Sequence, residues 1–221
     1  MSNADNSQER VKLVVFDMDS TLIDAETIDE LAAVAGVGHK VAMITEMAMN
    51  GELEYSHALN ERVKLLEGLS VQKAQEALDK MPFMPGAHEL VKFFKSRGYR
   101  TAMISGGFTI ATARVGNALG MDHVISNELI IDNGCLTGEV TGPLTGRGNK
   151  ELVLEEISRE YGIEPEECIV IGDGANDICI FKRARYAIAF NAKPILHQYA
   201  DVVITKKDLE AVIPVIEALD V

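Results

Sequence analysis

The chain has 221 residues, 47% of them apolar, enough to bury the core of one α/β domain plus a small second domain. Its formal net charge of −13 argues against nucleic acid and anionic membrane surfaces as partners, because both attract basic residues. No stretch approaches the roughly 20 apolar residues of a membrane span, and residues 1–10 lack a signal peptide's apolar segment. We therefore expect a polar tail over 1–10. The 3 cysteines have no metal-ligand spacing, which favours a reducing cytoplasm.

The first predicted element is a strand over residues 13–16, where four apolar residues in a row are typical of a strand buried on both faces. Asp17 and Asp19 follow directly, at the end of the strand where open α/β sheets hold their ligands. Two carboxylates this close repel each other unless a cation lies between them, and carboxylate oxygens suit Mg²⁺. A polar turn is the alternative, and this segment alone does not separate the two.

A helical insert is predicted over residues 24–83. Its helices are expected at 26–35, at 40–66 with a break at Asn50-Gly51, and at 71–80, and its methionines are expected to fill gaps in the core. A connection of about 60 residues is too long for an ordinary loop, so the insert is placed to cover the two acids. We call residues 24–83 the cap, and residues 11–23 with 84–221 the core domain.

The pattern after the cap alternates between helix and strand. Helices are predicted over 87–97, 108–119, 150–161, 178–184 and from 208 onward, and strands over 99–104, 123–126, 168–171, 186–190 and 202–204. Asn133-Gly134 predicts a hairpin turn, and Pro214 a kink or restart in the last helix. This alternation predicts an α/β fold with a doubly wound parallel sheet.

Further polar residues follow the later strands. Ser105-Gly106-Gly107 offers a hydroxyl and backbone N–H groups, which suit a phosphate. Lys150 offers a point charge, while Asp173 and Asp177 lie in a glycine-rich turn and are metal-ligand types. Singly, each has a structural alternative: a helix cap, a solvated helix start or a tight turn. Together at one sheet edge they predict a site where a carboxylate can attack phosphorus.

These motifs occur in a recognisable order: D-M-D-S-T at 17–21, I-S-G-G at 104–107, Lys150, and G-D-G-A-N-D at 172–177. In them the chain resembles the haloacid dehalogenase-like phosphatases. E-T-I-D-E at 26–30 and A-K-P-I-L at 192–196 make it similar to their phosphoserine phosphatase branch. The resemblance implies a Rossmann-like core and Mg²⁺-dependent hydrolysis of O-phospho-L-serine through an aspartyl phosphate, the last step of L-serine biosynthesis.

The resemblance also implies roles in the reaction. Asp17 would be the nucleophile, and Asp19 the general acid and then the general base. The phosphate would be held by Ser105, Gly106, Lys150 and Asn176. Mg²⁺ would be bound by Asp17, the main-chain carbonyl of Asp19 and Asp173, with Asp177 in support.

Substrate selection is expected from the cap. The resemblance gives the substrate ammonium to Glu26 and its carboxylate to Arg62, with Met49 and Tyr55 lining the same pocket. From the residues alone, the structural interpretation is favoured for both: Glu26 as an acid stabilised at a helix N-terminus, and Arg62 as a surface cation on an amphipathic helix, although an arginine also suits a carboxylate.

Two rival functions remain open. The chain could transfer the phosphoryl group to an alcohol such as homoserine, or act on another small phosphorylated metabolite. A signalling receiver that stores phosphate on an aspartate is less consistent with a helical cap and a second acid at Asp19. We expect a small-molecule substrate as partner, with neither nucleic acid nor a membrane, and a monomer or homodimer.

Overall fold

The computed structural model describes residues 12–146 and 149–219, so the predicted tail over 1–10 lies outside the described residues. The strands of that part form a seven-stranded sheet in the order β4-β3-β2-β1-β5-β6-β7. Their bounds are β1 (Lys12–Phe16), β2 (Tyr99–Phe108), β3 (His123–Asp132), β4 (Cys135–Thr141), β5 (Ile169–Gly172), β6 (Tyr186–Phe190) and β7 (Val202–Ile204). Neighbouring strands are parallel except in the antiparallel pair of β3 and β4. The prediction of a doubly wound parallel sheet is confirmed, with the antiparallel β4 as a departure at its edge.

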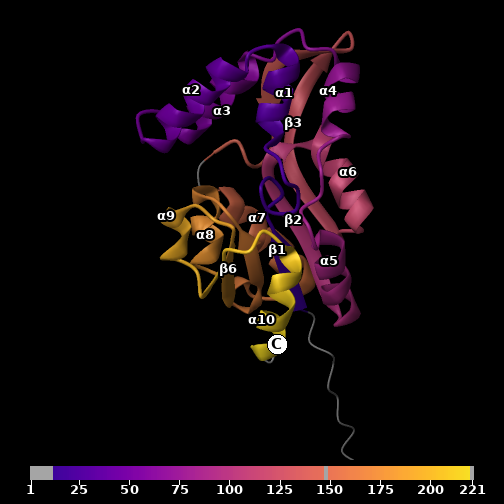
Figure 1. Cartoon of the computed structure of the whole chain (residues 1–221), viewed down its shortest axis with the longest axis vertical. Helices are drawn as coiled ribbons and strands as arrows, with labels where there is room; N and C mark the ends of the chain where they lie inside the picture. The colour runs from indigo at the N-terminus through magenta and orange to yellow at the C-terminus, as the bar shows by residue number, and fades with distance from the viewer. Residues whose placement is uncertain (1–11, 147–148, 220–221) are drawn as a thin grey trace, which may run out of the picture.

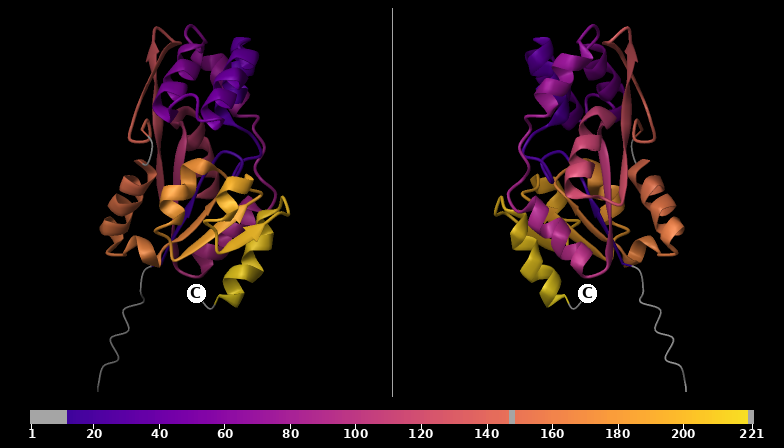
Figure 2. Two further views of the ribbon diagram at one scale, coloured as in Figure 1. Left: turned by 90° about the vertical axis from the view of Figure 1, so that its left-hand side faces the viewer. Right: turned by 90° about the vertical axis from the view of Figure 1, so that its right-hand side faces the viewer.

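Helices pack on both faces of this sheet (Figures 1 and 2). Their bounds are α5 (Ala87–Ser96), α6 (Thr109–Leu119), α7 (Asn149–Tyr161), α8 (Ile178–Phe181), α9 (Pro194–His197) and α10 (Ile213–Ala218). Val14 and Phe16 of β1 belong to one buried cluster with α5, α6 and α10, while Leu13 and Val15 belong to a second with α7, α8 and α9. The strand that carries Asp17 is therefore held by apolar packing on both sides, as its sequence predicts.

Four helices of the cap lie at one end of the sheet, around the far end of the hairpin of β3 and β4 (Figures 1 and 2). They are α1 (Thr27–Ala35), α2 (Gly38–Met49), α3 (Tyr55–Lys64) and α4 (Val71–Leu78). The predicted break at Asn50-Gly51 is confirmed, since α2 stops before it and Gly51 takes a positive φ of 77°.

The expectation that the cap methionines fill core gaps is wrong for α2. Met43, Met47 and Met49 are 52%, 40% and 66% exposed. Only Val41 of this helix is buried, so α2 rests on its neighbours through a narrow stripe that the methionines do not share. An apolar residue in a short helix is buried only where another element covers it.

The hairpin of β3 and β4 reaches into the cap. The Gly68 N–H donates to the Leu136 carbonyl over 2.8 Å, the Leu136 N–H to the Leu69 carbonyl over 2.9 Å, and the Val71 N–H to the Gly134 carbonyl over 3.0 Å. These bonds satisfy the backbone of an edge strand, which otherwise exposes unpaired groups. The predicted boundaries assign the whole hairpin to the core domain, but its tip is bonded to the cap. The division into core and cap itself stays a prediction.

Several elements differ in extent from their predicted bounds. β2 runs on to Phe108, and its register with β3 shifts between Ile104 and Phe108. The chain restarts as α10 at Ile213 after a 3₁₀ turn over Leu209–Val212, which confirms the predicted effect of Pro214. Across residues 12–146 and 149–219, no helix combines the length and apolar content that a membrane span requires.

Candidate active site

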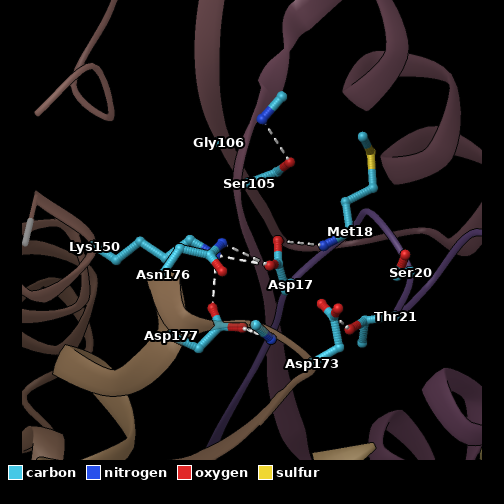
Figure 3. Close-up of polar contacts among 12 residues, drawn as sticks. Asp17, Met18, Ser20, Thr21, Ser105, Gly106, Lys150, Asp173, Asn176 and Asp177 are labelled. Atoms are coloured by element: carbon cyan, nitrogen blue, oxygen red, sulfur yellow. Dashed lines mark hydrogen bonds and ion pairs between the residues drawn. The ribbon is translucent and has the colours of Figure 1, made fainter. Parts of the chain in front are cut away.

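Three carboxylates meet at the carboxyl edge of the sheet, as Figure 3 shows. Asp17 follows β1, Asp173 follows the adjacent β5, and Asp177 lies in the 3₁₀ turn before α8. The Asp17 N–H donates to the Ile171 carbonyl over 3.0 Å, which joins the ends of the two strands. The three side chains each offer an oxygen, all within 4.8 Å of one another, and are only 4%, 6% and 0% exposed.

The electrostatics of this cluster fit a divalent cation. Burial, followed by the charges of Asp17 and Asp177, raises the pKa of Asp173 to about 8. Burial also raises the pKa of Asp177 to about 6, although Lys150 opposes the shift. The negative charge of the cluster thus exceeds what its surroundings neutralise. Clustered carboxylate oxygens are the ligands preferred by hard divalent ions, so these residues suit such a metal.

Asp17 is held in one orientation by its neighbours (Figure 3). Its Oδ1 accepts from the Met18 N–H over 2.7 Å, and its Oδ2 accepts from Asn176 Nδ2 over 3.0 Å. Lys150 Nζ lies 3.0 Å from the same Oδ2 and 2.7 Å from Asp177 Oδ1. Burial lowers the pKa of Lys150, but Asp17 and Asp177 outweigh it and the pKa ends above its usual value. The ammonium is therefore a fixed positive charge beside Asp17.

The Ser105-Gly106-Gly107 turn lies next to this cluster (Figure 3). The Gly107 N–H donates to Ser105 Oγ over 3.0 Å, so the serine hydroxyl keeps its own proton as a donor. A Cβ atom on Gly106 would lie 2.9 Å from the Tyr55 hydroxyl, which reaches here from the start of α3. A glycine at this position lets the cap approach the turn closely.

Hydrogen bonds across the boundary between the core domain and the cap hold Asp19 and Glu26. Thr27 Oγ1 donates to Asp19 Oδ1 over 2.6 Å, and Ser20 Oγ donates to Glu26 Oε1 over 2.7 Å. Burial, reinforced by Glu26, raises the pKa of Asp19 to about 8, and burial also raises the pKa of Glu26. The raised pKa favours the protonated form of Asp19, which is the form that can donate a proton. Sequence reasoning assigned no role to Thr27 or Ser20, although Ser20 lies within the first motif.

The remaining cap residues are less tightly held. Arg62 donates from Nε to the Ala58 carbonyl over 3.2 Å and from Nη1 to Thr45 Oγ1 over 3.3 Å, and burial lowers its pKa. Both partners belong to the cap. Met49 lies at the end of α2 with its side chain 66% exposed. The structure thus brings the core residues and Tyr55 together, whereas Met49 is exposed at the end of α2.

The fold and this site define a class of protein. The model of the haloacid dehalogenase-like hydrolases matches residues 14–182, and the chain belongs to this family.

Comparison with individual proteins shows which branch of this family the chain belongs to. The chain is 48% identical to a phosphoserine phosphatase of Archaeoglobus fulgidus over 90% of this chain, but spans 58% of that relative's length. It is 43% identical to the phosphoserine phosphatase of Methanocaldococcus jannaschii, over 95% of this chain and 100% of the relative. Within the hydrolases, the chain belongs with the phosphoserine phosphatases.

Solved structures give the same result. A phospho-aspartyl intermediate analogue of phosphoserine phosphatase superposes with a TM-score of 0.89 at 44% identity, covering 93% of this chain and 99% of the other. A substrate-bound phosphoserine phosphatase complex superposes with a TM-score of 0.89 at 43% identity, covering 94% and 99%. The fold match extends over the core and the cap together.

Proposed function

We propose that this chain hydrolyses O-phospho-L-serine to L-serine and phosphate, with Mg²⁺ as cofactor and an aspartyl phosphate on Asp17 as intermediate. This is the last step of L-serine biosynthesis. The observation that carries the proposal is the position of Asp17: a buried carboxylate that contacts the Lys150 ammonium and has an oxygen within 4.8 Å of oxygens of Asp173 and Asp177. Relatives named phosphoserine phosphatase support the choice of substrate.

The proposed chemistry has two steps at phosphorus. An Asp17 oxygen forms a bond to phosphorus as the bond to the serine oxygen breaks, and Asp19 donates a proton to that leaving oxygen. Asp19, now ionised, then takes a proton from a water molecule that attacks phosphorus and releases Asp17. The raised pKa of Asp19 supports its role as the acid in the first step.

The phosphate and the metal are assigned to the core. Ser105, the Gly106 turn, Lys150 and Asn176 would contact the phosphate oxygens. Mg²⁺ would be held by Asp17, the Asp19 main-chain carbonyl and Asp173, with Asp177 in support. When bound, the ion would offset the charge of the phosphate and the carboxylates.

The serine part of the substrate is assigned to the cap. Glu26 would accept the ammonium group, and Arg62 would bind the carboxylate with its planar guanidinium. Tyr55 and Met49 would line the space between them. Of these, Tyr55 has the strongest geometric support, because its hydroxyl lies against Gly106.

A cytoplasmic location and a small-molecule substrate complete the proposal. Cys135, Cys168 and Cys179 are all free, which suits a reducing compartment. The assembly as a monomer or a homodimer stays a prediction.

A panel of phosphomonoesters tests the proposal. Phosphate release should be fastest with L-phosphoserine and should require Mg²⁺. Homoserine is included as an acceptor, because transfer would yield phosphohomoserine in place of free phosphate. A panel in which phosphoserine is no better than unrelated phosphomonoesters would overturn the proposed substrate.

A further inference from the structure

Asn127 is a buried amide that joins three segments of the core. It lies in β3 and its exposed fraction is 0%. Its Nδ2 donates to the Gly106 carbonyl over 3.1 Å, and its Oδ1 accepts from the Leu144 N–H over 2.9 Å. Both ends of the amide are therefore used, one on the Ser105-Gly106-Gly107 turn and one on the connection from β4 to α7.

The first bond replaces a missing contact in the sheet. β2 pairs with β3 at Ile104 with Ile125 and again at Phe108 with Asn127, so residues 105–107 bulge out of the ladder. A bulge leaves backbone groups without their usual strand partners. The Asn127 side chain supplies a partner to the Gly106 carbonyl inside this bulge, where an unsatisfied buried carbonyl is costly.

That bond also fixes the direction in which Ser105 can donate. The Gly106 carbonyl and the Gly107 N–H belong to the same planar peptide group. Asn127 holds the carbonyl side, while the N–H side donates to Ser105 Oγ over 3.0 Å. Because the serine oxygen accepts that bond, its proton is directed to another acceptor, which in the proposed function is a phosphate oxygen.

The second hydrogen bond of Asn127 is to the connection between β4 and α7, the helix that carries Lys150. Gly142 passes so close that a Cβ atom there would lie 2.8 Å from Asn127 Oδ1, and Leu144 follows with its N–H on the amide. The Pro143 carbonyl accepts from Asn149 Nδ2 over 2.7 Å, and Asn149 precedes Lys150 at the start of α7. One side chain thus connects the turn with Ser105 to residues that contact the start of α7, where Lys150 lies.

We propose that Asn127 is a positioning residue that holds the Ser105 turn and the Lys150 segment in register for one phosphate group. This inference rests on the proposed function, in which both groups bind phosphate. It assigns to Asn127 no contact with substrate. The consequence is that Asn127 governs affinity for the phosphate itself and is indifferent to the rest of the substrate.

The test compares Asn127→Leu, which keeps the side-chain size without a donor or acceptor, with Thr112→Val. Thr112 is also buried and bonds Ser126, the neighbour of Asn127 in β3, over 2.8 Å, so its loss removes one hydrogen bond from the same strand. Binding of inorganic phosphate is measured in the presence of Mg²⁺ by calorimetry, alongside kcat/KM for phosphoserine and p-nitrophenyl phosphate.

We expect Asn127→Leu to weaken phosphate binding by about tenfold or more and to lower kcat/KM equally for both substrates, because small misplacements of binding groups have effects of this size. Thr112→Val should stay within about twofold of the parent protein. Phosphate binding by Asn127→Leu equal to that of Thr112→Val would overturn the proposal, whatever its melting temperature.

These measurements distinguish failure of the proposed function from failure of the proposed role of Asn127. If the parent protein hydrolysed no phosphomonoester, the proposed function would fail, while the phosphate titrations would still decide the role of Asn127. If Asn127→Leu did not fold, Asn127→Ser would take its place, since it removes the same two contacts with a smaller polar group. Unchanged phosphate affinity in that variant would equally contradict the proposal.

Discussion

The two halves of the candidate site are built differently. The core half contains a buried set at most 6% exposed, namely Asp17, Ser105, Lys150, Asp173 and Asp177, and Lys150 contacts both Asp17 and Asp177 directly. In the cap half, the side-chain hydrogen bonds of Arg62 stay within the cap, and Met49 is 66% exposed. The groups suited to phosphate chemistry are therefore held at the edge of the sheet, whereas the groups suited to substrate selection lie on the helices of the cap.

This difference has a direct consequence for substitutions. A change in the core half should affect every phosphomonoester alike, since all share the phosphate. A change in the cap half should affect phosphoserine and spare substrates without an amino-acid part. The following experiments are ordered from the largest expected effect to the smallest.

The largest effect is expected from Asp17→Asn. An amide is not a nucleophile toward phosphorus, so kcat should fall by about 10⁴-fold or more for every substrate, as for other lost nucleophiles. Steady-state phosphate release with phosphoserine and p-nitrophenyl phosphate measures this, and circular dichroism confirms folding. A variant that kept a tenth of the activity would point to a different nucleophile.

Removal of the metal should come next. Chelation with EDTA should lower activity by at least about 100-fold on both substrates, since metal ions contribute several kcal/mol of charge stabilisation. Added Mg²⁺ should restore it. Full activity in EDTA, after dialysis against the chelator, would show that the three buried carboxylates serve another purpose.

Arg62→Ala should change the contribution of the cap half of the site and leave that of the core half unchanged. Losing a buried charged partner of the substrate carboxylate costs about 2–3 kcal/mol, so kcat/KM for phosphoserine should fall roughly 30- to 150-fold. The value for p-nitrophenyl phosphate should hardly change. Lys64→Ala, an exposed cation on the same helix, is the matched control and should leave both substrates unaffected. Equal losses on both substrates would make Arg62 a structural residue.

The pH dependence should distinguish the leaving groups. Asp19 donates a proton only in its neutral form, and its pKa is raised to about 8. As pH rises through that value the acid is lost, so kcat for phosphoserine should fall about tenfold per pH unit. p-Nitrophenolate leaves without a proton, so kcat for p-nitrophenyl phosphate should not fall as pH rises through this value. If kcat fell in the same way with both substrates, the pH dependence would belong to a group other than Asp19.

The smallest effect is expected from Met49→Ala. An exposed side chain contributes about 0.5 kcal/mol or less, so KM for phosphoserine should change by about twofold at most. Met43→Ala, on the same helix and 52% exposed, is the control. A large change with Met49→Ala alone would mean that α2 moves onto the substrate when it binds, which would sharpen the contrast between the tightly held core half and the cap half.

Sequence reasoning was strongest where function is encoded locally. Asp17 and Asp19 directly follow a run of buried residues, and a parallel sheet gathers such strand ends at one edge. The helices of residues 24–83 could also be predicted locally, from their helical periodicity and from the length of the connection that contains them.

Contacts between distant segments could not be predicted in this way. Asn127 lies 21 residues from Gly106, and no spacing rule marks it. The bonds between Leu136 and the cap depend on where the hairpin tip lies in space. The exposed Met43 and Met47 show the same limit, since periodicity identifies an apolar face but not whether another element covers it.

The central claim is that Asp17 carries the phosphoryl group during turnover. The most direct measurement is rapid acid quenching of the enzyme with phosphoserine and Mg²⁺, followed by mass spectrometry of the peptide that contains residues 12–24. The account predicts a phosphoryl group on Asp17 that is absent in Asp17→Asn and without Mg²⁺. A phosphoryl group on another residue, or turnover with no phosphorylated enzyme at any time, would contradict it.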